Sequence, residues 1–313
     1  MKKELIIFDT DIGGDCDDAG ALALIHALCE KGEAKLLAVT GCYASPYIAG
    51  CIDAINTHYN NKVPVAMNYK RYKHDDDYGG YKGYAKPIYE KFKHSYKNEQ
   101  DVPDTLYLLR KILSESEDNS VTLVATGTFG SLARLVESTA DDISPLSGKE
   151  LITKKLKRTV VMGGRFTESW PFDINVKAEW NIKNFIEAAQ TVCEEWPGEL
   201  VFSSYEIGLW CVTLKSFRDE CADTNPAAFA YKLFPWAAEG RSSWDLTAVL
   251  YAIRPNADYY NLHEYGKVSV DNEGVTTFET VEGGNHTYLL VKKDYKQIED
   301  VINNLVKESK YYK

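Results

Sequence analysis

The feature that most constrains this chain is a dense group of aspartates that follows a short apolar run near the N-terminus. Leu5 to Phe8 is apolar and predicts a buried strand. The ten residues that follow carry five carboxylates: Asp9, Asp11, Asp15, Asp17 and Asp18. At separations of about 5 Å and an effective dielectric constant of about 20, each like-charge pair costs about 3 kcal/mol. A folded cluster of this kind therefore needs a cation or shared protons, and a divalent metal is the simplest solution.

The surrounding residues predict where this cluster lies. Gly13 and Gly14 allow the backbone to bend sharply after the strand, and Asp17 and Asp18 open an amphipathic helix whose positive N-terminus tolerates them. The carboxylates therefore gather at the C-terminal end of a strand, where open α/β sheets bind their ligands. Turn formation and helix capping would explain one or two of these aspartates but not all of them.

The spacing excludes an EF-hand. The twelfth position of such a loop requires a bidentate glutamate, but it falls on Gly20 when counted from Asp9 and on Leu22 when counted from Asp11. Oxygen ligands favour calcium or magnesium over zinc. The sequence thus predicts a site for a hard divalent cation.

Composition restricts the class of partner. The chain has 313 residues, a net charge of −10 and a pI near 5.2, which argue against nucleic acid or an anionic membrane as a partner. A small neutral ligand or a cation fits better, and a homo-oligomer stays open. With 44% hydrophobic residues the chain can form a substantial core, and we expect one domain over residues 1–313.

The cysteines indicate the compartment. All seven are scattered along the chain without a Cys-x-x-Cys pair, which predicts free thiols in a reducing cytoplasm. We expect no signal peptide, because only a four-residue apolar run follows the N-terminal lysines, and no segment approaches the length of a membrane span. The expected localisation is therefore cytoplasmic.

Short apolar runs alternate with helical periodicity along most of the chain. The expected strands are residues 5–8, 35–40, 63–67, 121–125, 158–162 and 200–203. The expected helices are one that Gly32 ends, 45–59, one that begins at Asp104, 130–136, 183–195, 226–238 and 244–253. Right-handed crossovers make such strands parallel. The pattern predicts an α/β fold with a doubly wound, mainly parallel open sheet, similar to a Rossmann fold.

The C-terminal part is richer in β-structure. Residues 268–270, 275–280 and 287–291 are short β-prone runs, and a four-residue turn at 271–274 joins the first two. We expect them to form a small antiparallel hairpin or edge sheet appended to the main sheet. Residues 295–306 have the period of a closing amphipathic helix.

Residues 69–89 interrupt the alternation with tyrosines among glycine, lysine and aspartate. They include Tyr69, Tyr72, Tyr78, Tyr81, Tyr84 and Tyr89. Two interpretations stay open: a surface loop whose tyrosines pack on one another, and a lid that faces a ligand. His74 with Asp75 to Asp77 resembles a metal cluster, but an exposed polar tract explains it better.

Several motifs together resemble a known family. Asp9 to Asp18 is similar to the N-terminal Asp-x-Asp-x-Gly-x-Asp-Asp signature of the calcium-dependent nucleoside hydrolases, the inosine-uridine preferring N-ribohydrolases, with two extra residues before the final Asp-Asp. Later landmarks of the family follow in order at residues 124–127, 162–164, 179–181 and 245–249. The resemblance covers most of the chain and implies hydrolysis of ribonucleosides to base and ribose.

The resemblance also implies roles for single residues. Asp11, Asp18, the Thr126 carbonyl and Asp245 would hold calcium, with Asp11 as the general base. The residues that would bind ribose are Asp17, Asn175, Glu179 and Asn181. This set agrees with the chemistry, because a cation activates water, a carboxylate accepts its proton, and further carboxylates stabilise an oxocarbenium-like sugar.

The chain departs from the family at the residue that protonates the leaving base. The position before Asp245, often histidine in this family, is Trp244, which cannot act as an acid at neutral pH. Core packing and stacking on the nucleobase are the two interpretations of Trp244, and Trp170 and Trp180 are further candidates for stacking. A family asparagine after the second strand is also missing, since Cys42 follows Gly41.

Two other functions compete with nucleoside hydrolysis. A strand followed by Asp-x-Asp also opens the haloacid-dehalogenase-like phosphatases, in which Asp9 would be the nucleophile, Asp11 the acid and magnesium the metal. The absent histidine and asparagine would also suit a metal-dependent nucleoside or ribose binder without catalysis. None of the six histidines stands at the expected site, and His26 and His58, within expected helices, are interpreted as structural.

Overall fold

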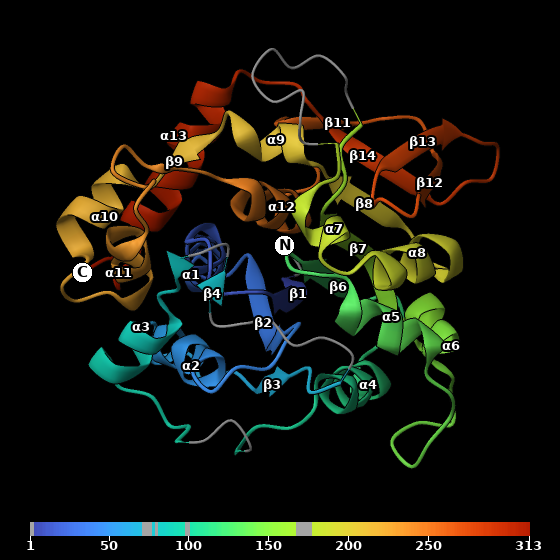
Figure 1. Cartoon of the computed structure of the whole chain (residues 1–313), viewed down its shortest axis with the longest axis horizontal. Helices are drawn as coiled ribbons and strands as arrows, with labels where there is room; N and C mark the ends of the chain where they lie inside the picture. Colours follow the sequence, from blue (N-terminus) through green and yellow to red (C-terminus); the bar gives the residue numbers. More distant parts are fainter. Residues whose placement is uncertain (1–2, 71–76, 79–80, 98–100, 167–176) are drawn as a thin grey trace.

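A ten-stranded, mainly parallel sheet organises the chain in the computed structural model, which describes residues 3–70, 77–78, 81–97, 101–166 and 177–313 (Figure 1). Its strands run in the order β13-β12-β14-β8-β7-β6-β1-β2-β3, and β11 pairs with β14. The strands are β1 (Glu4–Thr10), β2 (Ala34–Gly41), β3 (Val65–Met67), β6 (Val121–Ala125), β7 (Leu156–Met162), β8 (Leu200–Ser203), β11 (Tyr260–Leu262), β12 (Gly266–Val270), β13 (Thr276–Thr280) and β14 (His286–Val291). Two small ribbons, β4 (Asp77–Tyr78) with β5 (Tyr81–Lys82) and β9 (Val212–Thr213) with β10 (Arg241–Ser242), lie outside it.

Helices cover both faces of the sheet (Figure 1). They are α1 (Asp17–Glu30), α2 (Ile48–His58), α3 (Ala85–Lys91), α4 (Thr105–Glu115), α5 (Gly130–Glu137), α6 (Gly148–Lys155), α7 (Trp180–Lys183), α8 (Ile186–Glu195), α9 (Tyr205–Leu209), α10 (Lys215–Cys221), α11 (Pro226–Leu233), α12 (Trp244–Ile253) and α13 (Tyr295–Lys307). None of the helices in the described ranges is both long and apolar enough to span a bilayer.

The pleat of the strands divides the core into two clusters. Ile6 and Phe8 of β1 join the cluster beneath α1, α2, α11, α12 and α13, whereas Ile7 joins the cluster beneath α4, α5, α6 and α8. Alternate side chains of a strand point to opposite faces, so a strand covered on both sides must be apolar throughout. This explains why the central strands are continuous apolar runs, and it confirms the predicted α/β class.

The chain changes direction across the sheet at β1. From β1 it proceeds outward through β2 and β3, then returns to place β6 on the other side of β1 and continues through β7 and β8. All these neighbours are parallel. Such a switch point opens a crevice at the carboxyl ends of the two strands, in which ligands bind. The aspartates that follow β1 therefore lie at this crevice.

The C-terminal strands differ in part from the expectation. β12 and β13 form the predicted antiparallel hairpin. β14 does not belong to an appendage, because it pairs in parallel with β8 through Thr287 and Val201 and extends the main sheet. Periodicity alone cannot distinguish a short buried parallel strand from an edge strand, which explains the error.

Three predicted helices have different limits in the structure. α11 ends at Leu233, not near residue 238, because Phe234 precedes a proline and is extended with ψ of 120°. α2 begins at Ile48, whose N–H donates to the Ser45 carbonyl in a turn before the helix. The expected helix over residues 183–195 is two helices, α7 and α8, and α7 begins before the predicted start.

Candidate active site

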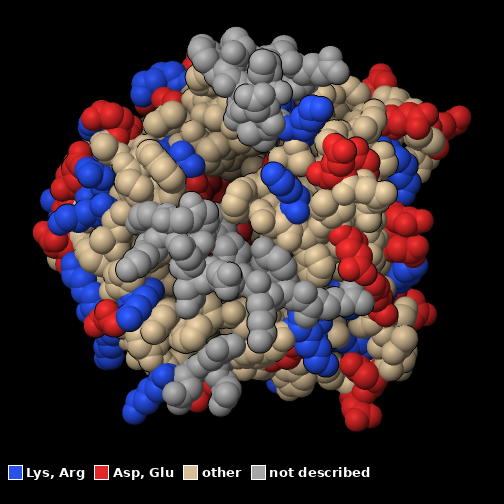
Figure 2. Space-filling model, viewed as in Figure 1, with Lys and Arg blue, Asp and Glu red and all other residues tan. Residues whose placement is uncertain are grey.

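A cavity of about 550 Å³ opens at the carboxyl end of the sheet, beside the switch point. Residues from the loop after β1, the ends of β6 and β7, and the starts of α1, α7 and α12 line it. Its lining includes the predicted site residues Asp11, Asp17, Asp18, Thr126, Glu179, Asn181, Trp244 and Asp245. Figure 2 shows acidic atoms at the base of a hollow in the corresponding face of the molecule.

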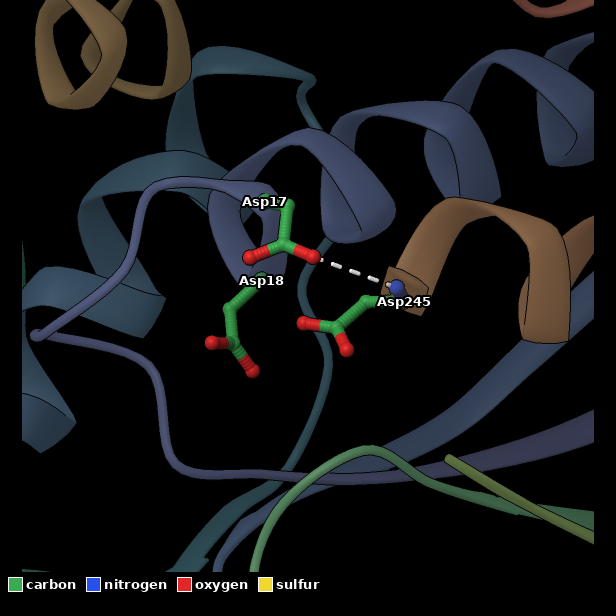
Figure 3. Close-up of side chains that lie close together, drawn as sticks. All are labelled: Asp17, Asp18 and Asp245. Carbon is green, nitrogen blue, oxygen red and sulfur yellow. Dashed lines mark hydrogen bonds between the residues drawn. The ribbon is translucent and has the colours of Figure 1, made fainter. Parts of the chain in front are cut away.

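Three carboxylates from two distant segments meet in this cavity. Asp17, Asp18 and Asp245 each offer an oxygen, and these oxygens lie within 4.8 Å of one another (Figure 3). Asp17 and Asp18 begin α1, and Asp245 lies in the first turn of α12. The Asp245 backbone N–H donates to Asp17 Oδ2 at 3.2 Å, which joins two residues 228 positions apart. The positive N-termini of both helices therefore face the same charges.

The trio is buried, and that determines its electrostatics. The three side chains are 3 to 4% exposed. Burial, and then the charges of neighbouring carboxylates, raise the pKa values of Asp17, Asp18 and Asp245 well above the usual range. Either protons or a cation must relieve this repulsion. A hard divalent cation fits the all-oxygen donor set.

Hydroxyl groups orient Asp18. The Thr10 hydroxyl at the end of β1 and the Thr126 hydroxyl after β6 both donate to Asp18 Oδ1, the latter at 3.2 Å. Because β1 and β6 are adjacent parallel strands, these hydroxyls reach the same oxygen. The Asp18 carboxyl group also hydrogen-bonds with that of Asp245, so the two groups are close enough to share a proton or a cation.

Asp11 lies in the same cavity but outside the tight trio. It is 5% exposed, and its charge adds to burial in raising the pKa values of Asp18 and Asp245. The sequence assigned Asp11 to the metal and Asp17 to ribose, whereas the closest carboxylates in the structure are Asp17, Asp18 and Asp245. The prediction depended on Asp245 lying near Asp11 and Asp18. Asp245 lies in the trio with Asp18, and all three residues line the same cavity.

Glu179 and Asn181 form a second polar wall. Glu179 caps α7 and accepts backbone N–H groups of Asn181, Ile182 and Gly164 at 2.9, 3.2 and 3.3 Å. Burial raises the pKa of Glu179 to about 7 even though these bonds favour the carboxylate. The Asn181 amide donates to the carbonyl of Thr126 at 2.9 Å and to that of Met162 at 3.2 Å. The Thr126 carbonyl, a predicted metal ligand, thus already accepts one bond.

Trp244 is half-buried against other side chains. Its indole N–H donates to the Tyr205 carbonyl at 2.8 Å, and its ring is stacked on Tyr205 at 5.7 Å between centroids. The Arg241 guanidinium lies 4.8 Å from the centre of the Trp244 ring. The indole N–H is therefore committed to the backbone, although the ring lines the cavity.

Arg241 and Tyr205 also line the cavity, and neither was predicted from the sequence. Asp15 accepts from Arg241 Nε at 2.9 Å, and also from Nη2. The one available signal was Asp15 itself, because an additional carboxylate in so acidic a segment requires a cationic partner. Nothing in the sequence indicated that this partner lies more than two hundred residues later.

Of the remaining candidates, Trp180 lines the cavity at the start of α7. Asn175, Trp170 and His74 lie outside the described residues. No described residue of the tyrosine-rich segment lines the cavity, and Tyr84 is fully buried at the start of α3. His26 is buried and bonded to Asn56 at 2.9 Å, and the ring of His58 meets the Tyr311 carbonyl at 2.7 Å, which supports their structural interpretation.

The geometry disfavours the phosphatase alternative. Asp9, the nucleophile in that alternative, is 0% exposed and does not line the cavity. It accepts from the Thr40 hydroxyl of β2 at 2.5 Å, and burial raises its pKa to about 7. A fully buried side chain that does not reach the cavity cannot attack a phosphate ester there.

Comparison with known proteins agrees with this geometry. The chain matches none of the curated protein sequences with which it was compared. Its fold is similar to that of a plant nucleoside hydrolase, the PpNRh1 enzyme, with a TM-score of 0.71 and 17% identity over 97% of this chain and 99% of the other. An inosine-guanosine nucleoside hydrolase gives 0.71 and 21% over 97% and 98%. An inosine-uridine preferring nucleoside hydrolase from Bacillus anthracis gives 0.67 and 22% over 97% and 99%.

These structural likenesses, at low identity, establish a shared fold. The family model extends the result to the sequence, because the model named inosine-uridine preferring nucleoside hydrolase matches residues 6–304, from β1 into α13. The matched range contains every residue of the carboxylate trio and of the polar wall formed by Glu179 and Asn181. The chain belongs to the inosine-uridine preferring nucleoside hydrolase family.

Proposed function

We propose that this nucleoside hydrolase cleaves the N-glycosidic bond of ribonucleosides, with Ca²⁺ as its cofactor and Asp11 as the general base. The observation that carries the proposal is the convergence of Asp17, Asp18 and Asp245 in a cavity of a protein of this family. Asp18 and Asp245 belong both to this trio and to the set implied by the sequence. We assign them to the cation together with Asp11 and the Thr126 carbonyl.

The protein's own groups divide the work around the sugar. When bound, a calcium ion would supply a Lewis acid that lowers the pKa of water and orients ribose hydroxyls. Asp11 accepts the proton of the attacking water, since it shares the cavity with the trio. The remaining carboxylates favour the positive charge that develops on the sugar in the transition state.

Ribose recognition falls to the other polar groups of the cavity. We assign it to Asp17, Glu179 and Asn181, and to Asn175 by resemblance alone. The backbone N–H bonds fix the Glu179 carboxylate: Oε2 accepts two of them and Oε1 accepts one, so that Oε1 retains a lone pair for a hydroxyl donor. A rigid acceptor of this kind costs little entropy when the sugar binds.

The direct test is ribose release from a panel of ribonucleosides, with and without a chelator. We expect release of reducing sugar that the chelator abolishes and that added Ca²⁺ restores better than Mg²⁺. Asp11→Asn should lower kcat by on the order of 10³-fold while the unfolding temperature stays close to that of the unaltered protein. Unchanged turnover in Asp11→Asn would remove Asp11 from its role.

Calorimetry separates the enzyme from a binder without catalysis. A ribonucleoside that binds in the presence of Ca²⁺ but yields no ribose over hours would favour the binder.

The apolar wall at Trp244 and Tyr205 supports a nucleobase as the group next to the sugar. Release of purine bases would place the protein in purine salvage or general nucleoside catabolism.

We also propose that residues 1–313 form one domain that works in the cytoplasm. Both hydrophobic clusters pack on the same sheet, which supports a single unit. The seven cysteines are free thiols, and six of them are buried, which suits a reducing compartment.

A further inference from the structure

The departing base is the part of the proposed reaction for which the family residue is absent. When the glycosidic bond breaks, negative charge collects on the base, and a donor near the base must stabilise it. Trp244 stands at the position in question, but its only N–H donor is bonded to the Tyr205 carbonyl at 2.8 Å. Another cavity residue must therefore interact with the base.

Arg241 is held in place against this position. Its guanidinium carbon lies 4.8 Å from the centre of the Trp244 ring and 5.0 Å from that of Phe234. Asp15 accepts from Nε at 2.9 Å and from Nη2. Two aromatic rings and a two-point ion pair thus hold the guanidinium in one orientation. The Arg241 side chain therefore loses little conformational entropy when a ligand binds.

One edge of the guanidinium stays available. Asp15 occupies Nε and Nη2, so the two N–H bonds of Nη1 have no hydrogen-bond partner among the residues that the structure describes. Arg241 lines the cavity that holds Asp17, Asp18 and Asp245. The other cations of the lining, Lys177 and Lys183, are exposed and therefore well hydrated.

We propose that Arg241 is the catalytic residue that stabilises the leaving base, and that Asp15 is the residue that positions it. The inference rests on the proposed hydrolysis of ribonucleosides. A guanidinium does not lose its proton at neutral pH, so Arg241 acts as a fixed hydrogen-bond donor and positive charge, not as an acid. Its contribution grows as charge moves onto the base, which is the condition for accelerating the reaction.

The step balances without a further reactant. The C1′–N bond breaks and its electron pair stays on the base, whose ring nitrogen or carbonyl oxygen accepts hydrogen bonds from Nη1 of Arg241. The oxygen of water forms the new bond to C1′, and one proton of that water passes to the Asp11 carboxylate. The base then takes a proton from solvent, and Asp11 returns its proton to solvent.

The N-terminal motif explains the origin of Asp15. The segment Asp9 to Asp18 is two residues longer than the family signature that it resembles, and Asp15 lies within the longer part. The charge of Arg241 also reaches Asp17, whose pKa it lowers. The two bonds to Asp15 hold the guanidinium beside the Trp244 ring.

The test compares two ribosides that differ in how strongly their cleavage depends on a hydrogen-bond donor to the leaving group. Inosine expels a poor leaving group, whereas 4-nitrophenyl β-ribofuranoside expels a stable phenolate that needs no donor. We expect Arg241→Gln to lower kcat for inosine by on the order of 10²-fold and to leave kcat for the nitrophenyl riboside within about threefold. Arg241→Lys should recover part of the loss, and Asp15→Asn should lower kcat for inosine only.

A matched control is available on the other side of the molecule. Arg254 pairs with Glu33 through two bonds of 2.7 Å, and neither residue lines the cavity. The two pairs have similar side-chain exposure, 20% and 22% for Arg241 and Asp15 and 23% and 30% for Arg254 and Glu33. Arg254→Gln should therefore change the unfolding temperature about as much as Arg241→Gln does, with no change in kcat for either substrate.

Each other outcome overturns the proposal in a distinct way. Equal losses on both ribosides would show that Arg241 supports folding or sugar binding. A higher KM with unchanged kcat would make Arg241 a ground-state binding residue. No change on either substrate would remove it from the reaction. If the unaltered protein releases ribose from neither compound, the proposed hydrolysis itself fails and this inference fails with it.

Discussion

At the scale of single residues, the site is a balance between carboxylates that repel one another and the groups that hold them together. Asp17, Asp18 and Asp245 are almost fully buried, and hydroxyls, a backbone N–H group and a contact between the Asp18 and Asp245 carboxyl groups orient them. Such groups orient a carboxylate without cancelling its charge. The charges of the trio therefore destabilise the cation-free protein and favour the binding of a cation.

This balance predicts opposite effects of one substitution. Asp18→Asn removes a charge but retains an oxygen for the hydroxyls of Thr10 and Thr126. In chelator, we expect the variant to be more stable than the unaltered protein by about 1 to 3 kcal/mol, because like-charge repulsion is relieved. With Ca²⁺ in excess, the order should reverse, since only the unaltered protein gains binding energy. Thermal unfolding in both conditions measures the two effects.

Asp11→Asn and Asp17→Asn test whether Asp11 or Asp17 binds the cation together with Asp18 and Asp245. The variant that loses more of the Ca²⁺-induced rise in unfolding temperature lacks a ligand, and the other lacks only a neighbouring charge. Our assignment requires the larger loss in Asp11→Asn. A larger loss in Asp17→Asn would give the cation to the compact trio instead.

At the scale of elements, the starts of α1, α7 and α12 build the site. Glu179 is both the N-cap of α7 and a wall of the cavity, so one side chain joins helix formation to the site. Glu179→Gln should destabilise the fold by about 1 to 2 kcal/mol, because the amide turns a donor toward backbone N–H groups that need an acceptor. Ribose release should fall with it.

The exposed capping box of α6 is the control for Glu179. Ser147 and Glu150 cap that helix reciprocally and do not line the cavity. Ser147→Ala should cost about 1 kcal/mol in urea unfolding without an effect on ribose release. A loss of activity in Ser147→Ala comparable to that in Glu179→Gln would mean that activity follows stability alone.

The elements also show what sequence could and could not predict. The alternation of apolar runs with helical period located β1, β6, β7 and β8 to within about two residues, because a strand buried on both faces is a continuous run of apolar residues. The same pattern did not place β14 inside the sheet. The start of α7 before residue 183 was missed, because its N-cap is Glu179, which the family resemblance indicated only as a sugar ligand.

The site was predicted unevenly for a similar reason. Asp17, Asp18 and Asp245 lie at helix starts, where order along the chain and the resemblance located them. The pair formed by Asp15 and Arg241 was not predictable, because β10 is a two-residue strand that pairs only with β9 and leaves no periodic signal. Contacts made by such short ribbons depend on the completed tertiary structure.

At the scale of the whole molecule, buried histidines make stability depend on pH. Burial lowers the pKa values of His26 and His286 to about 4, below the usual value of about 6.5 in the unfolded chain. The unfolded chain therefore binds more protons between these pH values. Each histidine contributes stability that is complete above pH 6.5 and is lost as the pH falls toward 4, by about 3 kcal/mol.

Comparison with His26→Gln isolates this contribution, since glutamine can still donate to Asn56. The stability difference between the two proteins should shrink by about 3 kcal/mol from pH 7 to pH 4 in chemical unfolding. Excess Ca²⁺ in both samples opposes protonation of the carboxylate trio. That protonation would otherwise add a pH dependence of opposite sign to the free energy of unfolding. A constant difference over this range would show that His26 titrates normally.

The distance along the chain between Asp17 and Asp245 has a consequence for biosynthesis. A ribosome that adds about 5 to 20 residues per second needs roughly 10 to 45 s to cover the 228 positions between them. During that interval the growing polypeptide carries the N-terminal aspartates but lacks the partner that completes their pocket. A translation product that stops before α12 lacks Asp245, and we expect it neither to bind the cation nor to release ribose.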